Sequence, residues 1–473
     1  MRNLRRLMAL LAVTALPPMP AATPVVAAEP AEHAADLEHI VRRLLGELAG
    51  ETRAERAGAE KRLVELGPRV LPLLPPPELL PSVSVREAVR RVRFELERTA
   101  AQESVRASRL TLESTTPLGR SLAEIARQTA NRLDGHLLPE DRLQQPIDMD
   151  LKSIPFWQAL DGLCARLKLR YEYDAGIRGL KLVPAGAGKA PHQTAVCYAG
   201  AFRVEALPAE RTPRIAGRRR GQRARSPDEL LKVTVVLLPE PRLRPLFLQF
   251  AASEITARAG DQLKLMPFSP EADYELPLRE SGAPAQIQLE YFIPKSAAGT
   301  AIELSGKLRC TTAAGHELIR FTDLEKAEAG GGANVARRRG GVTVALNKVR
   351  VSRASAGRQE ARIQVTVTYD AGGPAFESHR AWILHNEVFL EDRAGKRVEL
   401  NGGSETTLQE DGAVGIEYRF VDLPASLRDF AFVYVAPTLI VDVPIEFEIQ
   451  SVPIGRKSPD PNSNEEIPKR SPP

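Results

Sequence analysis

The sequence predicts a multidomain α+β protein: an N-terminal helical segment, a small duplicated βαβ domain and two mainly antiparallel β-sandwich domains. Three observations predict this class. Apolar residues recur at 3.6-residue spacing from Glu32 to about Arg98, one unit occurs twice between Leu110 and Val183, and alternating runs separated by Pro and Gly extend from Thr194 to Ile454. The length of 473 residues suits roughly three domains, at about 150 residues each.

Residues 1–28 have the layout of a secretory signal peptide. Arg2, Arg5 and Arg6 form a basic start, residues 7–16 are apolar, and Val26-Ala27-Ala28 offers small residues for cleavage before Glu29. Ten apolar residues are too few for a membrane span, which needs about 20. No later segment reaches that length, so we expect no membrane span after cleavage and a periplasmic or secreted location.

The composition is ordinary for a globular protein, with 43% hydrophobic and 26% charged residues. Removal of the signal takes away three Arg and no acidic residue, which lowers the formal net charge from +5 to +2. A chain so close to neutral is not expected to be a general polyanion or specific nucleic-acid binder.

Residues 29–107 are predicted to be helical. Gly50 ends the first apolar stripe, Gly67-Pro68 ends the second, and a third helix carries Val85 to Leu96. Arg56 to Leu63, Leu66-Gly67-Pro68, Leu71 to Leu74 and the second-helix pattern around Val85-Arg86 and Arg90-Arg91 resemble a HEAT-type repeat. There is room for one or two repeats, so the segment is expected either to bind protein or to pack on the next domain.

Residues 108–186 contain the duplication, which predicts the order β-α-β, β-α-β-β. Each copy has an extended lead-in (Leu110 to Leu112, or Ile147 to Met149), then a Pro, a helix and an apolar run. The predicted helices are Ser121 to Asn131 and Phe156 to Lys168. The equivalent positions, 38 apart, are Pro117 and Pro155, Leu118 and Phe156, Leu122 and Leu160, Ile125 and Leu163, Ala126 and Cys164, Leu133 and Tyr171.

A family resemblance appears in this stretch. Ile147-Asp148-Met149-Asp150-Leu151-Lys152-Ser153-Ile154-Pro155-Phe156-Trp157-Gln158-Ala159-Leu160, with the earlier run Pro117 to Asn131, resembles the short N-terminal domain of secretins and TonB-dependent receptors. The resemblance covers about 75 residues, and it implies a small α+β domain used for protein–protein contact in the cell envelope. We find no counterpart of the membrane-embedded part of those proteins, so only the interaction role is carried over.

The remaining chain is predicted to form a β-sandwich over 187–335, an immunoglobulin-like sandwich over 336–455 and a disordered tail over 456–473. Trp382 is expected in the core of the second sandwich. Cys164 is expected to be a buried thiol, and Cys197 and Cys310 either pair across one β-domain or remain free. This tandem arrangement is similar to that of exported bacterial proteins without an assigned activity.

One cluster of basic residues is the candidate for anion contact. Residues 211–225 hold seven Arg and no acidic residue, in a segment with Gly and Pro that predicts a loop. It either contacts an acidic ligand or is a solvated insertion, and no aromatic residue is interleaved for base stacking. Arg337 to Arg339 are interpreted in the same way. The candidate residues are Arg211, Arg214, Arg218, Arg219, Arg220, Arg223 and Arg225.

No motif predicts catalysis, a metal or a cofactor. His379 and His385 share a predicted strand but lie too far apart for one ion, and His136, His192 and His316 lack ligand spacing. A Gly-x-Ser-x-Gly nucleophile turn and a phosphate-binding loop are absent. The sequence thus favours a non-enzymatic envelope protein that contacts other envelope proteins. The alternatives are a binding protein for an anionic polysaccharide, through the Arg-rich segment, and a hydrolase assembled from scattered residues.

Overall fold

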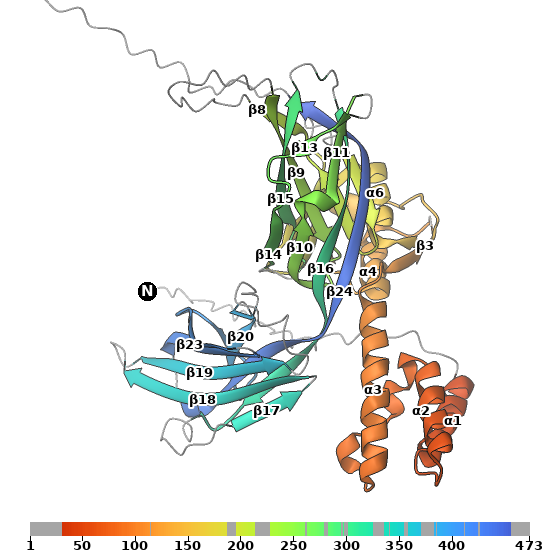
Figure 1. Ribbon diagram of the computed structural model, residues 1–473, viewed down its shortest axis with the longest axis vertical. Helices are drawn as coiled ribbons and strands as arrows, with labels where there is room; N and C mark the ends of the chain where they lie inside the picture. The colour runs from red at the N-terminus through yellow and green to blue at the C-terminus, as the bar shows by residue number, and fades with distance from the viewer. Residues whose placement is uncertain are drawn as a thin grey trace, which may run out of the picture.

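The computed structural model describes residues 31–113, 115–186, 195–212, 228–260, 263–278, 282–294, 297, 301–324, 335–339, 341–353, 358–369, 383–384, 386–410, 412–423 and 426–455. It is a mixed α+β structure, mostly sheet, with the helices toward the N-terminus and mainly antiparallel strands (Figure 1). The predicted signal peptide, the predicted tail, Trp382, His192, His379 and His385 lie outside the described residues.

The N-terminal segment consists of α1 (Ala31–Glu47), α2 (Arg53–Glu65) and α3 (Val83–Ser104), with the 3₁₀ turns η1 (Pro68–Leu73) and η2 (Pro77–Leu79) between α2 and α3. Thr52 and Glu55 form a reciprocal capping box that starts α2, and Gly67, with φ +80°, ends it before Pro68. The predicted helical spacing is confirmed, because the residues predicted to face inward form one core. Within the described residues, no helix combines the length and apolar composition that a bilayer span needs. The core includes Val41, Leu44, Leu48, Ala59, Leu63, Val85, Val89, Val92 and Leu96.

The small α+β domain packs two helices against two sheets. One sheet pairs β1 (Arg109–Leu112) with β3 (Leu151–Pro155), and the other has the order β2-β5-β4. Both helices bury their apolar faces in a common core. The other elements are α4 (Leu118–Thr129), β2 (Leu133–Asp134), α5 (Glu140–Leu143), α6 (Phe156–Leu167), β4 (Leu169–Asp174) and β5 (Gly179–Pro184).

The second lead-in strand was predicted in the wrong place. Ile147 to Met149 is not a strand, and β3 begins at Leu151. Ile147 is fully buried, but Asp148 has φ +49°, so the chain turns there and cannot continue as a strand. The first helix also begins three residues earlier than predicted, directly after Pro117.

The next part, which we call the wrapped lobe, consists of β6 to β15 with the first half of β16 and the second half of β24. Its sheet follows the path β12-β11-β16-β24-β8-β9-β15-β13. The two ends of this path are adjacent in the chain, joined by Leu265, whose side chain is buried in the core. The sheet therefore wraps around one core, whereas the sequence predicted two stacked layers. The strands are β6 (Ala195–Ala199), β7 (Phe202–Ala206), β8 (Ala209–Thr212), β9 (Asp228–Pro239), β10 (Arg244–Ala251), β11 (Ile255–Ala259), β12 (Leu263–Lys264), β13 (Met266–Pro267), β14 (Asp273–Pro277) and β15 (Ala285–Pro294).

The second β part, which we call the sandwich lobe, has two layers. A five-stranded antiparallel sheet of order β17-β18-β19-β23-β22 packs on β20 and on the other halves of β16 and β24. Arg337 to Arg339 lie in a strand, β17, and not in the predicted loop. The strands are β17 (Val335–Arg339), β18 (Val342–Arg353), β19 (Gln359–Tyr369), β20 (Val388–Asp392), β21 (Arg397–Glu399), β22 (Ser404–Glu410) and β23 (Ala413–Leu423).

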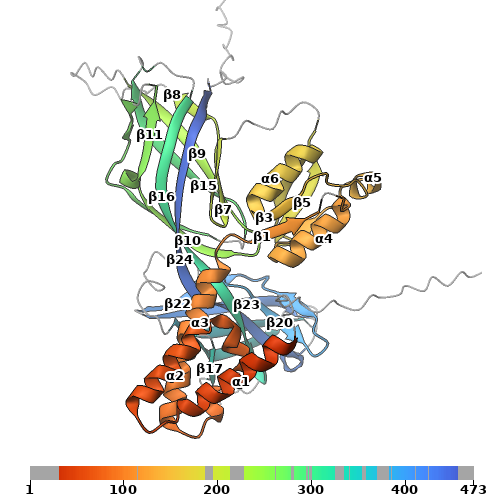
Figure 2. The same cartoon turned by 90° about the vertical axis from the view of Figure 1, so that its right-hand side faces the viewer.

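Two long strands run through both lobes, as Figures 1 and 2 show. β16 (Ala301–Phe321) and β24 (Phe430–Gly455) pair antiparallel from Ala301 opposite Pro453 to Phe321 opposite Phe432. Residues of both strands contribute to both cores. The predicted boundary between 335 and 336 therefore does not divide the chain into two independent domains, since each lobe needs residues from both sides of it.

Candidate interaction site on the small domain

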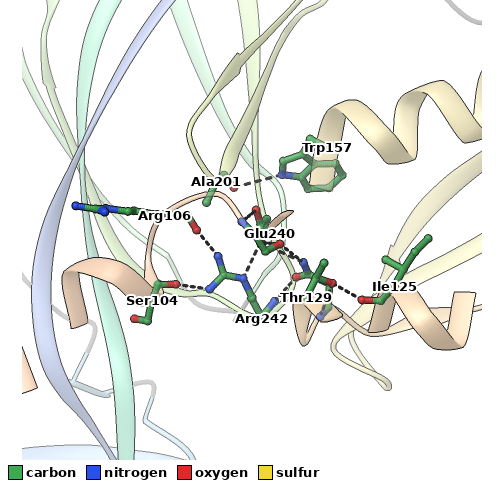
Figure 3. Close-up of polar contacts among 10 residues, drawn as sticks. Ser104, Arg106, Ile125, Thr129, Trp157, Ala201, Glu240 and Arg242 are labelled. Carbon is green, nitrogen blue, oxygen red and sulfur yellow. Dashed lines mark hydrogen bonds and ion pairs between the residues drawn. The ribbon is translucent and has the colours of Figure 1, made fainter. Parts of the chain in front are cut away.

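A polar joint fastens the small domain to the wrapped lobe, and its centre is Glu240, in the turn between β9 and β10 (Figure 3). Glu240 is fully buried. Its carboxylate accepts hydrogen bonds from the Ser108 amide (2.9 Å) and hydroxyl (2.6 Å), from Asn131 Nδ2 (3.1 Å) and from Arg242 Nε (2.6 Å). A buried carboxylate is tolerated only when it is paired and hydrogen-bonded in this way. We call this set the Glu240 joint.

Arg242 extends the Glu240 joint to the helical segment. Its guanidinium donates to the carbonyl oxygens of Ser104 and Arg106, at the C-terminal end of α3, where a cation is favourable. Its backbone N–H donates to Asn131 Oδ1 at 3.0 Å, just after α4. One turn of the wrapped lobe thus holds α3, β1 and α4 together. Val105, the residue after α3, also enters the core of the wrapped lobe.

A second joint lies at α6 and is centred on Asp161. The carboxylate accepts hydrogen bonds from the hydroxyls of Tyr171 (2.7 Å) and Tyr198 (2.6 Å) and from Arg203 Nε (2.8 Å). Arg203, on β7, also pairs with Glu205. We call this set the Asp161 joint.

Trp157, one turn before Asp161 on α6, completes the contact. Its side chain is only 2% exposed. Its Nε1 donates to the carbonyl of Ala201, between β6 and β7, at 3.3 Å (Figure 3). The indole therefore contributes both packing and a satisfied hydrogen bond to the boundary between the two parts.

Burial controls the chemistry of the titratable groups here. It raises the pKa of Tyr171, and burial with the hydrogen bond to Asp161 raises the pKa of Tyr198, so both phenols stay neutral donors. Burial likewise raises the pKa of the Cys164 thiol to about 12. A thiol in that state is not a nucleophile near neutral pH.

The face of α6 that carries Trp157 and Asp161 is therefore used within the molecule, whereas the outer face of α4 is exposed. It carries Arg120, Ala123, Arg127 and Gln128. The Gln128 side chain accepts a hydrogen bond from the Thr111 amide (2.8 Å) and donates one to the Thr111 carbonyl (2.9 Å). These two hydrogen bonds occupy the outer edge of β1. Hydrogen bonds from Arg127 and Gln128 lower the pKa of Glu124 to about 2, so this face keeps mixed charges.

The structure does not assemble the predicted anion site in its described part. Arg211 lies in β8, where it donates to the Ala297 carbonyl (3.1 Å) and sits 3.7 Å from the Glu229 carboxylate. Thus Arg211 belongs to a strand and not to a loop. The other six arginines, Arg214, Arg218, Arg219, Arg220, Arg223 and Arg225, lie outside the described residues.

The other candidate residues have local roles. His136 contacts the Asp134 carboxylate through Nδ1 at 2.6 Å, and His316 lies on β16 opposite Pro437. Cys197 and Cys310 are both free thiols, so the alternative with a disulfide is not adopted. Over the described ranges, no group of three or more His, Cys, Asp or Glu side chains is placed to hold a metal ion.

Sequence reasoning missed the residues of both joints. Ser108, Asn131 and Glu240 belong to no motif, and they meet only because the β9–β10 turn returns to the start of the small domain. Asp161 and Trp157 could have been found, because the equivalent positions in the first copy, 38 residues earlier, are Ala123 and Gly119. Where the residue types at equivalent positions of the two copies differ this strongly, the position is a candidate for contacts with the rest of the chain.

Comparisons with known proteins give no family. No protein-family model matches the chain, and no curated protein is significantly similar to it. Among solved structures, pT26-6p has 7% sequence identity over 56% of this chain and 66% of that chain, with a TM-score of 0.14. The chain thus spans just under two thirds of the length of that protein. A similarity at this TM-score carries no argument about fold or function.

Proposed function

We propose that this chain is an exported, non-enzymatic envelope protein, periplasmic or secreted, that acts as a protein-interaction or scaffold module. The observation that carries the proposal is the way the small domain is fixed. The Glu240 and Asp161 joints fasten it to the wrapped lobe, and β16 and β24 connect that lobe to the sandwich lobe. Such a support presents the outer face of α4 in a fixed orientation.

We also propose the domain identities that the sequence suggested. In this proposal the helical segment is HEAT-like, residues 108–186 form a domain of the secretin/TonB short N-terminal type, and the sandwich lobe is immunoglobulin-like. The element order of the small domain, β-α-β followed by β-α-β-β, supports the second identity. The resemblance predicts that this domain makes the principal protein contact.

The contact is assigned to α4 because the face of α6 that carries Trp157 and Asp161 is already occupied. Trp157 and Asp161 contact the wrapped lobe, so a partner cannot use that face without undocking the domain. On α4, Ala123 is exposed at the centre of the outer face, and a partner helix or loop packed there would exclude a longer side chain.

The experiment compares two matched substitutions. Ala123→Arg places a long charged side chain on the outer face of α4, and Ala57→Arg does the same at an exposed position of α2. Partners would be cross-linked in envelope extract, identified, purified and titrated against the full-length protein. We expect Ala123→Arg to weaken binding at least tenfold, and Ala57→Arg to leave it unchanged.

Two outcomes would contradict the proposal. Equal binding by both variants would reject α4 as the contact surface, and failure to reconstitute any stoichiometric complex would reject the scaffold role. Export is tested separately by N-terminal sequencing of the mature protein, for which we expect Glu29 as the first residue.

A further inference from the structure

The outer face of the five-stranded sheet carries an unusual row of like charges. Arg350 on β18 lies opposite Arg362 on β19, which lies opposite Arg419 on β23. Like charges directly opposite one another on neighbouring strands are destabilising. Such a row is stable only if other groups neutralise it.

The neutralisation is confined to one end of the row. Glu360 accepts from Arg362 Nε (3.0 Å) and from both Nε and Nη2 of Arg419 (2.8 Å each). The hydrogen bonds from Arg419 lower the pKa of Glu360 most, and that from Arg362 lowers it further, so the carboxylate stays ionised. Glu417 adds a contact of 3.5 Å to Arg362. At the β18 end, neither Arg350 nor Lys348 has a carboxylate within 4 Å among the described residues.

The sheet is hollowed at this end. The register between β18 and β19 shifts between Leu346 and Lys348, and Asn347 is the additional, exposed residue. Beyond the shift lies an open groove of about 520 Å³. Its lining consists of Lys348, Val349, Arg350, Val351, Ser352 and Arg362.

The charge changes sign across the face. Lys348 and Arg350 stand at the β18 side, whereas Glu405 on β22 lies opposite Glu417 at the far side. Lys348 and Arg350 are two residues apart on one face of a strand, which separates them by about 7 Å. The groove thus offers two separated cations on β18, while Glu360, on the neighbouring strand β19 opposite Ser352, is occupied by Arg362 and Arg419.

We propose that this groove binds an acidic polysaccharide through its carboxylate or other oxyanion groups. The guanidinium of Arg350 matches the geometry of an oxyanion, and Lys348 supplies a second positive charge for the next charged group. The Ser352 hydroxyl can exchange hydrogen bonds with sugar hydroxyls.

Single-stranded nucleic acids fit this groove less well. None of the described residues that line it is aromatic, so the stacking used for single-stranded nucleic acids is missing. β17 pairs with β18 only as far as Leu346, so beyond that residue β18 is paired with a described strand on its β19 side alone, and the polyglutamate titration below distinguishes an acidic peptide from a polysaccharide. The groove is distinct from the Arg-rich segment 211–225 and independent of the proposed contact on α4.

The test titrates polygalacturonate into the full-length protein at low ionic strength. The variant Lys348→Gln/Arg350→Gln removes the two cations, and Arg393→Gln/Lys396→Gln removes two exposed cations from the β20–β21 turn, where Arg393 contacts Asp429 only at 3.8 Å. We expect binding about tenfold weaker for the first variant, roughly the effect of one charge-assisted contact, and a change below about twofold for the control. Added salt should weaken wild-type binding.

Three results would overturn the proposal: no measurable binding by the wild type, equal losses in both variants, or loss of binding when Arg214 to Arg225 alone are changed to Gln. Polyglutamate serves as a second probe. If it binds as tightly and with the same dependence on Lys348 and Arg350, the groove recognises acidic peptides and the polysaccharide assignment fails. Ala123→Arg should bind polygalacturonate normally, which separates this test from that of the scaffold role.

Discussion

The helices of the two copies in the small domain have the same length and the same kinds of ends, but different surroundings. Helices α4 and α6 each have 12 residues, each is preceded by a proline (Pro117, Pro155), and each ends in a left-handed residue, Ala130 or Lys168, again 38 positions apart. Yet the outer face of α4 is exposed, while one face of α6 is docked on the wrapped lobe. The duplicated pattern thus specifies the shape of each copy but not its neighbours.

The docked copy differs from the exposed copy at the positions that make the contact. Trp157, Asp161 and Tyr171 stand where the first copy has Gly119, Ala123 and Leu133. In the structure, these three side chains form the α6 side of the Asp161 joint and its neighbouring contact. Residues that break a repeat therefore identify the face that a domain uses against the rest of the chain.

The largest expected effect on stability comes from replacing Trp157, the largest of these three side chains. Trp157→Ala should lower the free energy of unfolding by about 3–5 kcal/mol, because it removes a buried indole and leaves a cavity. Gly119→Ala at the equivalent position should be neutral or stabilise by up to about 1 kcal/mol, because alanine favours the helix. An added Cβ there meets nothing closer than the Leu143 carbonyl at 3.4 Å. Chemical denaturation followed by far-UV circular dichroism measures both.

A second readout separates loss of docking from loss of the small-domain fold. Hydrogen exchange of the α6 and β7 amides should accelerate in Trp157→Ala, while those of α4 should keep their protection. Equal effects of the two substitutions would contradict the assignment of docking to the second copy.

Replacing Asp161, the acidic residue of the three, should have a smaller effect on stability. Asp161→Ala leaves the Tyr171 hydroxyl without its acceptor and Arg203 with only Glu205, so we expect a loss of about 2–3 kcal/mol. Ala123→Asp, at the exposed equivalent position, should change stability by less than about 0.5 kcal/mol. Thermal unfolding of the two variants compares them, and a cost at Ala123 as large as that at Asp161 would reject the distinction between the faces.

Much of the local structure followed from the sequence, because it depends on neighbours in the chain. The apolar spacing predicted α1 to α3, and the duplicated pattern predicted α6 to within one residue. The start of β3 did not follow, since the turn at Asp148 depends on a left-handed backbone that no glycine announces.

The arrangement of the lobes could not be predicted in the same way. β16 and β24 have 21 and 26 residues, and in the sequence each resembles two short strands. Gly315, Pro437 and Leu439, with φ +52°, lie near the place where the strands pass from one lobe to the other, and they interrupt the alternation there. Glu240 was equally hidden, because its partners are more than 100 residues away in the chain.

The Asp161 joint should also make the protein sensitive to alkaline pH. The pKa of Tyr171 and that of Tyr198 are raised in the folded state, so the unfolded chain releases these protons first as the pH rises. The stabilisation is complete below about pH 10, the usual tyrosine pKa, and above it we expect a loss of about 1 kcal/mol per pH unit from Tyr171. Tyr198 contributes less, because its side chain is partly exposed.

The measurement is the free energy of unfolding between pH 8 and 11. Tyr171→Phe should make the alkaline decline shallower by about 1 kcal/mol per pH unit, and Tyr198→Phe by less. The decline that remains comes from the other tyrosines whose pKa is raised by burial, Tyr291, Tyr369, Tyr418 and Tyr434. The first copy has Leu133 at the position of Tyr171 and contributes nothing to this dependence. A decline as steep in Tyr171→Phe as in the wild type would place the alkaline sensitivity elsewhere.

The smallest expected effect on stability concerns a feature that both copies share, the left-handed residue that ends each helix. Ala130 has φ +57° and Lys168 has φ +53°, a conformation that costs an L-residue about 1–2 kcal/mol and glycine almost nothing. Ala130→Gly and Lys168→Gly should each stabilise by about 0.5–1 kcal/mol, the gain being reduced by the entropy that glycine loses on folding. Ala123→Gly, in the right-handed interior of α4, should instead destabilise by about 1 kcal/mol. If the two left-handed positions respond with opposite signs, the copies differ in backbone as well as in surroundings.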